Sequence, residues 1–210
     1  MQQYSVITEN LNKSFDVDSV LKNLDLKIIK GEIMAIVGPS GCGKTTTLRL
    51  IAGFEQPDKG KIILGDTIVA DEKTFLPPEK RGVGMVFQDF ALFPHLTVAE
   101  NISFGIKSKD KEKIREEVDS LLELVALNNL GDRFPHELSG GQRQRVSLAR
   151  ALAPKPDLIL MDEPFSNIDA DTRLIIREEV RKILKKLKTT AIFVTHDQGE
   201  ALVMSDRVVV

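Results

Sequence analysis

Cysteine, tryptophan and long apolar runs are scarce or missing in this sequence of 210 residues. The one cysteine, Cys42, excludes an intrachain disulfide and fits a reducing compartment. No apolar stretch approaches the roughly 20 residues that span a bilayer, and the opening segment MQQYSVITEN lacks the basic start and apolar run of a signal peptide. We therefore expect a soluble, cytoplasmic chain that reaches a membrane only through a partner.

An excess of positive charge is also missing, because the formal net charge is −2. No global positive field therefore draws the chain to nucleic acid or anionic lipid. The hydrophobic content of 42% and charged content of 29% are those of an ordinary soluble globular protein. The length suits one large domain or two small ones.

Short β-like runs come first, then a helical stretch, then β-like runs again. The first runs are YSVIT (4–8), LDLKII (24–29), EIMAIVG (32–38), KIILG (61–65) and TIVA (67–70), and the later ones are DLILM (157–161), TAIFVT (190–195) and RVVV (207–210). From about Phe87 the pattern turns helical, and a clear amphipathic helix covers 111–127, with one apolar stripe made by Ile114, Val118, Leu121, Leu122 and Val125. A further helix is expected over 171–188. Strands that alternate with helices and are almost continuously apolar favour an α/β fold with a mostly parallel, buried sheet.

A glycine-rich segment directly follows the β-run that ends at Val37. Its residues, Gly38, Pro39, Ser40, Gly41, Cys42, Gly43, Lys44, Thr45 and Thr46, fit the phosphate-binding pattern G-x-x-x-x-G-K-[ST]. The glycines let backbone N–H groups surround a phosphate chain, Lys44 supplies positive charge, and the Thr45 hydroxyl is placed for Mg²⁺. The alternative is an ordinary glycine-rich turn between a strand and a helix. A catalytic thiol at Cys42 is disfavoured, because phosphate chemistry gives that group no role.

Two carboxylates end the apolar strand LILMDEP (158–164). Asp162 at the strand tip can hold Mg²⁺, and Glu163 can polarise a water that attacks a γ-phosphate. A plain exposed strand end is an equally good interpretation of this motif alone, but the phosphate loop favours the functional one. His196 follows the next strand, where ligand residues gather in parallel sheets. His95 and His136 are interpreted as structural.

The segment LSGGQRQRVSLARAL (138–152) predicts a helix that begins at a small polar turn. Ser139, Gly140 and Gly141 leave the first N–H groups of this helix uncovered, which favours an anion site. The chain already has a better anion site in its phosphate loop, so a second one needs an explanation.

The phosphate loop, LSGGQ, LMDEP and the histidine after the last core strand resemble, in order and spacing, the ATP-binding subunit of an ABC transporter. The resemblance covers almost the whole chain, and LSGGQ is its most specific motif. It implies a P-loop NTPase core with a mostly parallel sheet, an N-terminal antiparallel β subdomain and an inserted α-helical subdomain. It also implies a head-to-tail dimer, in which the signature residues of one chain contact the ATP of its partner; these residues are Leu138, Ser139, Gly140, Gly141 and Gln142.

The same resemblance assigns roles to further residues. Phe15 takes the place of an aromatic that stacks on adenine, although tyrosine is commoner there. Glu163 matches the catalytic base, His196 the switch histidine and Gln88 the Q-loop glutamine, which reaches both Mg²⁺ and the attacking water. The Mg²⁺ ligands implied are Thr45, Gln88 and Asp162, and the D-loop residues are Ser166 and Asp169, with Asn167 where alanine is usual.

We expect an ATP-hydrolysing importer subunit that uses ATP and Mg²⁺ at the cytoplasmic face of the membrane. Its partners would be a second ATPase subunit, transmembrane permease subunits and a solute-binding protein, with no nucleic acid. AGFEQPDKG (52–60) and LPPEKRGVG (76–84) look most similar to ferric-iron importers. An ABC ATPase that acts on DNA or ribosomes is the alternative, disfavoured by the single cassette and the lack of long coiled coils. A P-loop kinase or GTPase leaves LSGGQ unexplained.

The domain organisation follows from the same resemblance. We expect a single ABC ATPase domain over 1–210, with its core at about 1–87 and 155–210 and a helical subdomain at about 88–154. The usual C-terminal end and any regulatory domain are expected to be absent. The apolar cluster of Ala91, Leu92 and Phe93 beside Pro94 has two interpretations, core packing or a groove for a helix of the membrane subunit.

Overall fold

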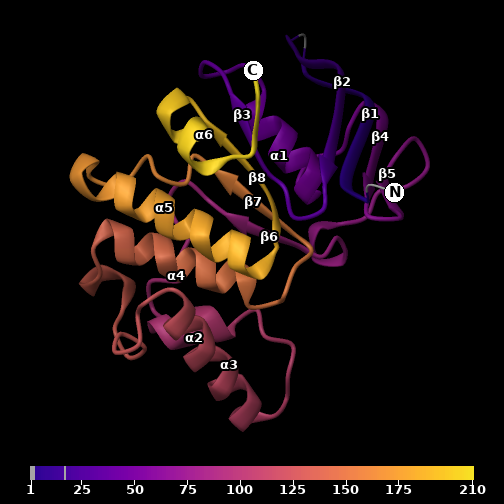
Figure 1. Cartoon of the computed structure of the whole chain (residues 1–210). Helices are drawn as coiled ribbons and strands as arrows, with labels where there is room; N and C mark the ends of the chain where they lie inside the picture. Colours follow the sequence, from indigo (N-terminus) through magenta and orange to yellow (C-terminus); the bar gives the residue numbers. More distant parts are fainter. Residues whose placement is uncertain (1–2, 17) are drawn as a thin grey trace.

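The computed structural model describes residues 3–16 and 18–210, which form two sheets and six α-helices in the described part of the chain (Figure 1). The antiparallel sheet consists of β1 (Tyr4–Phe15), β2 (Asp18–Ile29), β4 (Lys59–Leu64) and β5 (Thr67–Ala70). The parallel sheet consists of β3 (Ile33–Val37), β6 (Val83–Val86), β7 (Leu158–Asp162), β8 (Thr190–Thr195) and β9 (Arg207–Val209). The helices are α1 (Lys44–Ala52), α2 (Val98–Ser103), α3 (Lys111–Leu124), α4 (Gly140–Leu152), α5 (Ala170–Leu187) and α6 (Gln198–Met204), with 3₁₀ turns at Pro78–Lys80 and Pro135–Glu137.

The strand order of the parallel sheet is β6-β7-β8-β3-β9, and every pairing within it is parallel. Successive side chains of a strand point to opposite faces, so each strand serves two cores. On one face, Ile33, Ile159 and Phe193 pack with α4, α5 and α6. On the other face, Met34, Leu160 and Ile192 pack with α1 and the antiparallel sheet.

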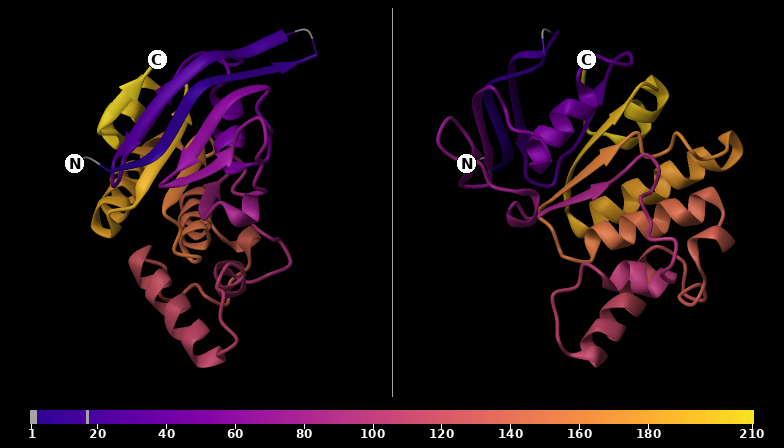
Figure 2. Two further views of the ribbon diagram at one scale, coloured as in Figure 1. Left: turned by 90° about the vertical axis from the view of Figure 1, so that its right-hand side faces the viewer. Right: turned by 180° about the vertical axis from the view of Figure 1, so that it is seen from behind.

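This division puts α1 between the two sheets and α4 on the far side of the parallel sheet (Figures 1 and 2). The phosphate-loop helix and the signature helix of one chain therefore lie on opposite faces of the same sheet. Buried residues of α2, α3 and α4 belong to the same apolar cluster, and α2 and α3 extend away from both sheets (Figure 1). The expected α/β class, with an antiparallel β subdomain and an inserted helical part, is confirmed.

The structure differs from the sequence analysis in one strand that was not predicted and in one helix that begins later than expected. The strand β6 was not predicted, because Gly82 and Gly84 interrupt its apolar pattern. A Cβ on Gly84 would lie 2.4 Å from the Ala151 carbonyl oxygen, so glycine lets β6 approach α4. The helical pattern expected from Phe87 begins only at Val98, where Thr97 and Glu100 form a capping box.

Within 3–16 and 18–210, none of the helices has both the length and the apolar character needed to cross a bilayer.

Candidate active site

The phosphate loop joins β3 to α1 and is held in a tight conformation. Gly41 and Gly43 have φ angles of 83° and 95°, which side chains disfavour. A Cβ on Gly38 would lie 2.6 Å from the sulfur of Cys42, so this glycine makes room for the cysteine inside the loop. The Nζ of Lys44 donates hydrogen bonds of 2.8 Å to the carbonyls of Gly38 and Pro39. The lysine charge thus lies inside the loop at the N-terminus of α1, where the helix dipole also favours an anion.

The Thr45 hydroxyl donates a 2.8 Å hydrogen bond to Oδ1 of Asp162, although the residues are 117 positions apart. Burial raises the pKa of Asp162, while the Thr45 hydrogen bond and the charges of Arg49 and Lys44 oppose that rise. The described residues hold no group of three or more His, Cys, Asp or Glu side chains that would cage a metal. One hydroxyl and one carboxylate instead suit Mg²⁺, which binds few protein oxygens and completes its shell with phosphates and water.

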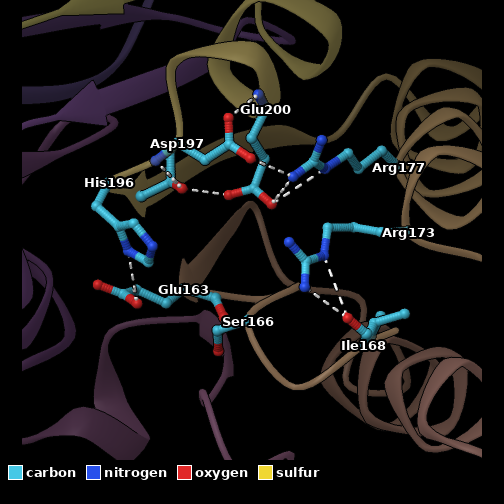
Figure 3. Close-up of polar contacts among 9 residues, drawn as sticks. Glu163, Ser166, Ile168, Arg173, Arg177, His196, Asp197 and Glu200 are labelled. Carbon is cyan, nitrogen blue, oxygen red and sulfur yellow. Dashed lines mark hydrogen bonds and ion pairs between the residues drawn. The ribbon is translucent and has the colours of Figure 1, made fainter. Parts of the chain in front are cut away.

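Glu163 follows Asp162 in the chain, and its carboxylate lies beside the histidine at the end of β8. Its Oε2 is 3.1 Å from Nδ1 of His196. Figure 3 shows the two side chains pointing toward each other. The backbone of Glu163 has a φ of 42°, and its N–H donates to the Val194 carbonyl of the neighbouring strand at 3.1 Å. A non-glycine residue in this region is strained and persists only where its surroundings hold it, a pattern common at active sites.

The D-loop is tied to Glu163 on one side and to the segment after β6 on the other. The backbone N–H and hydroxyl of Ser166 both donate to the Glu163 carbonyl, at 3.2 and 3.0 Å. The Asn167 side chain donates a 2.8 Å hydrogen bond to the carbonyl of Gln88. The resemblance gives alanine as the usual residue at position 167, and alanine has no side-chain donor. Asn167 therefore adds a hydrogen bond between the D-loop and the segment after β6. The side chain of Gln88 is exposed.

Asp169 ends the D-loop and caps α5. Its carboxylate accepts from the hydroxyl and the backbone N–H of Thr172, and these hydrogen bonds lower the pKa of Asp169. Arg173, in the first turns of α5, donates to the Ile168 carbonyl at 2.7 and 3.2 Å (Figure 3). Thr172 and Arg173, both in the first turn of α5, therefore hold the last two residues of the D-loop by hydrogen bonds.

Signature residues form the N-terminus of α4. Ser139 caps the helix by accepting from the Gln142 N–H at 3.3 Å, and the Gln142 side chain accepts from the Ser139 N–H at 2.8 Å. A Cβ on Gly140 would lie 3.1 Å from the Asn167 carbonyl, and one on Gly141 would lie 3.1 Å from the Ile176 side chain. Both glycines thus allow close packing against the D-loop and α5, while Leu138 is buried below them.

Phe15 ends β1 in the antiparallel sheet, opposite Asp18 of β2. The residue is 42% exposed, and Nζ of Lys13 lies 5.0 Å from the centre of its ring. The same hairpin reaches the phosphate loop, because a Cβ on Gly43 would meet the side chain of Leu21 at 2.8 Å. Stacking of Phe15 on adenine remains a prediction.

Sequence reasoning missed three polar side chains that organise these loops. Asn101, fully buried in α2, hydrogen-bonds the backbone of Phe93 in both directions and the carbonyls of Leu96 and Thr97. Arg177 and Glu200 form a buried ion pair next to His196. The spacing of Arg177 four positions after Arg173, on the same face of the predicted helix, was the sequence signal that could have drawn attention to it. His95 and His136 are exposed, and their rings lie near Phe93 and Phe134.

The chain is similar to curated proteins that are named as import ATP-binding proteins. It is 49% identical over 212 residues to the spermidine/putrescine import ATP-binding protein of Marinobacter nauticus, covering 100% of this chain and 56% of that protein. It is 47% identical over 204 residues to the Fe(3+) ions import ATP-binding protein of Fusobacterium nucleatum, covering 96% of this chain and 54% of that protein. The chain thus spans little more than half the length of these curated relatives.

The dimeric, post-hydrolysis structure of the ATP-binding cassette MJ0796, bound to ADP and Pi, superimposes with a TM-score of 0.82 at 32% identity, covering 97% of this chain and 93% of that one. A family model described as ABC transporter matches residues 21–166, well over half of the sequence. With this match, and with nearly half of all positions shared along the whole chain, the protein belongs to the ABC transporter family.

Proposed function

We propose that this chain is the ATP-binding and ATP-hydrolysing subunit of an ABC importer. The observation that supports it best is the meeting of three segments at one edge of the parallel sheet. Lys44 and Thr45 follow β3, Asp162 and Glu163 end β7, and His196 follows β8. The carboxyl ends of parallel strands form the usual ligand crevice of α/β sheets.

The residues divide the chemistry of hydrolysis among them. The phosphate loop and Lys44 bind the β- and γ-phosphates, and the Thr45 hydroxyl, Gln88 and Asp162 would hold Mg²⁺. When bound, Mg²⁺ withdraws charge from the phosphate oxygens. Glu163 accepts a proton from the attacking water, and His196 orients that carboxylate and contacts the γ-phosphate. The strained backbone of Glu163 supports a dedicated position for this carboxylate.

Two copies are proposed to form a head-to-tail dimer with ATP between them. The signature turn of α4 and the phosphate-loop helix α1 lie on opposite faces of one sheet. A second copy supplies the missing donor to each phosphate loop, and two-fold symmetry completes both sites together. The dimeric form of the related cassette supports this arrangement. In each subunit, residues 1–87 and 155–210 would form the ATPase core, and residues 88–154 would form the helical subdomain.

The partner in the membrane is proposed to dock beside α2. The Phe93 and Phe104 rings lie 4.7 Å apart between centroids, and Phe104 is 69% exposed. Leu92 instead packs against the core, which supports the core-packing interpretation for that residue. Asn101 fixes the loop that carries Phe93. This surface suits an apolar helix of a permease, which would hold the chain at the cytoplasmic face of the membrane.

The relatives of this chain are named for different cargoes. The relatives named for spermidine/putrescine and for Fe(3+) ions are almost equally identical to this chain. We infer that cargo is selected by the permease and a solute-binding protein. Ferric iron, from AGFEQPDKG and LPPEKRGVG, stays a prediction.

Glu163→Gln in the full-length protein tests the proposal. Loss of the base should lower kcat for ATP hydrolysis by about 10²- to 10⁴-fold while ATP binding persists. The control is Glu178→Gln, an exposed carboxylate on α5 that should retain wild-type turnover. An equally fast Glu163→Gln protein would overturn the assignment of the base.

Purification of the ATP-loaded Glu163→Gln protein from gently solubilised native membranes, with mass spectrometry, tests the importer assignment. A polytopic membrane protein with a solute-binding protein is the expected result. Ribosomal or chromatin partners would instead support an ABC ATPase that acts on those assemblies.

A further inference from the structure

The buried ion pair between α5 and α6 has no role in the chemistry described above. Arg177 on α5 is 8% exposed, and Glu200 on α6 is 4% exposed. The guanidinium donates to Oε1 of Glu200 at 2.9 and 3.1 Å and to Oδ2 of Asp197 at 2.8 Å (Figure 3). A buried pair of this kind costs desolvation, which makes it weak evidence for stability alone.

The carboxylates that Arg177 holds belong to the turn that carries the switch histidine. Asp197 is the residue after His196, and its Oδ1 caps α6 by accepting from the Glu200 N–H at 3.1 Å. Thr195, the residue before His196, donates its hydroxyl to Oε2 of Glu200 and accepts from the Asp197 N–H at 3.0 Å. Both neighbours of His196 are therefore anchored to one guanidinium through Glu200 and Asp197.

Within the part of the chain that the structure describes, the His196 ring has no anchor comparable to the Arg177 contacts. Its side chain is 59% exposed, and its hydrogen-bond partner is Oε2 of Glu163 at 3.1 Å. The ring position then depends on the backbone between Thr195 and Asp197. A displacement of about 1 Å in such a position costs roughly 100-fold in rate.

We propose that Arg177 is a positioning residue for ATP hydrolysis, which holds His196 against Glu163 by fixing the Thr195–Glu200 turn to α5. The proposal rests on the proposed roles of His196 and Glu163. Arg177 lies on α5, outside the phosphate loop, so its loss should change the rate of the chemical step and leave nucleotide binding at that loop intact.

The test compares Arg177→Met with Arg181→Met in the full chain. Arg181 lies one turn further along α5 and makes the same kind of link, but to the Met204 carbonyl at the C-terminal end of α6 and to Asp206 after it. Arg177→Met should lower kcat by about 10- to 100-fold and keep KM for ATP within about twofold. Arg181→Met should keep both constants within about twofold of the wild type.

A double-mutant cycle separates positioning from general loss of structure. If Arg177 acts through His196, Arg177→Met adds nothing further to His196→Ala. Because Arg177→Met alone leaves a buried carboxylate unpaired, Arg177→Met with Glu200→Leu is a second variant that removes both charges and preserves folding. It should show the same fall in kcat with a thermal melt close to that of the wild type.

The outcomes distinguish this proposal from the one on which it rests. Wild-type kcat in either Arg177 variant, or an effect that adds fully to His196→Ala, would overturn the positioning role while leaving ATP hydrolysis established. A wild-type protein without ATP hydrolysis would overturn the proposed function itself.

Discussion

Asp162 is placed for the proposed Mg²⁺ site, but its charged form lowers the stability of the folded protein. Burial raises its pKa even though Thr45, Arg49 and Lys44 all favour the charged form. The folded protein therefore binds a proton at Asp162 more tightly than the unfolded chain does. Stability must then fall as pH rises above the unfolded pKa of this group, because the carboxylate is charged and partly buried in the native state.

Asp162→Asn should relieve this cost while keeping an oxygen that accepts from Thr45. The variant is expected to melt at a higher temperature than the wild type at pH 7, and the difference should shrink as the pH is lowered through about 4. Thermal melts without nucleotide between pH 4 and pH 8 measure it. Activity should be lost, since the amide is a poor Mg²⁺ ligand.

The matched control is another aspartate whose pKa is shifted in the opposite direction. Asp71 accepts from the backbone N–H groups of Lys73 and Thr74, which lower its pKa. Asp71→Asn should therefore lose stability relative to the wild type as pH rises. Melting temperatures of Asp162→Asn and wild type that differ equally at every pH would contradict the argument.

At the scale of elements, α1 depends on a residue from another segment for its C-terminus. Arg81 is buried, and its guanidinium donates to the carbonyls of Leu50 and Ile51 in the last turn of α1 at 2.7 and 3.0 Å. It also donates to the carbonyls of Leu76 and Val69. Burial lowers the pKa of Arg81 to about 10, which leaves it charged at neutral pH and favourable at the negative end of a helix.

Arg81→Met should destabilise the fold by about 3 kcal/mol, because buried carbonyls lose a charged donor. Denaturant unfolding monitored by circular dichroism measures this change. Arg81→Lys keeps the charge but has fewer donors, so its free energy of unfolding should lie between those of the wild type and Arg81→Met. If Arg81→Met unfolded at the wild-type midpoint, the carbonyls would have another partner and this account of α1 would be wrong.

At the scale of the whole molecule, the signature turn and the phosphate loop begin helices that pack on opposite faces of one sheet. Ser139 and its glycines begin α4, whereas Lys44 begins α1. If the dimer is head to tail, a chain defective in Lys44 and a chain defective in Ser139 together contain one intact composite site. This follows from symmetry rather than from any property of either residue.

Two variants made in the Glu163→Gln background should therefore complement each other. Lys44→Ala and Ser139→Arg proteins are each expected to stay monomeric with ATP, and their mixture should form dimers by size-exclusion chromatography with light scattering. The unaltered Glu163→Gln protein serves as the positive control. A mixture that stays monomeric would mean that signature and phosphate loop do not act across two chains.

Local motifs could be interpreted from the sequence because their geometry depends on neighbouring residues. The glycine-rich loop, the helix that starts at Lys44 and the cap of α4 at Ser139 each lie within a few positions of the residues that stabilise them. β6 was missed for the opposite reason, because Gly84 is explained by its contact with the distant Ala151.

The sequence by itself determined which groups are available: the phosphate loop, the acidic strand end, the switch histidine and the signature turn. Only the tertiary structure decided which of them meet. The strand order β6-β7-β8-β3-β9 puts Asp162 against Thr45 and Glu163 against His196, and it separates α1 from α4. Likewise, the role of Arg177 depends on α5 and α6 packing together. Strand order and helix packing arise from long-range burial, so no spacing along the chain could have specified these contacts.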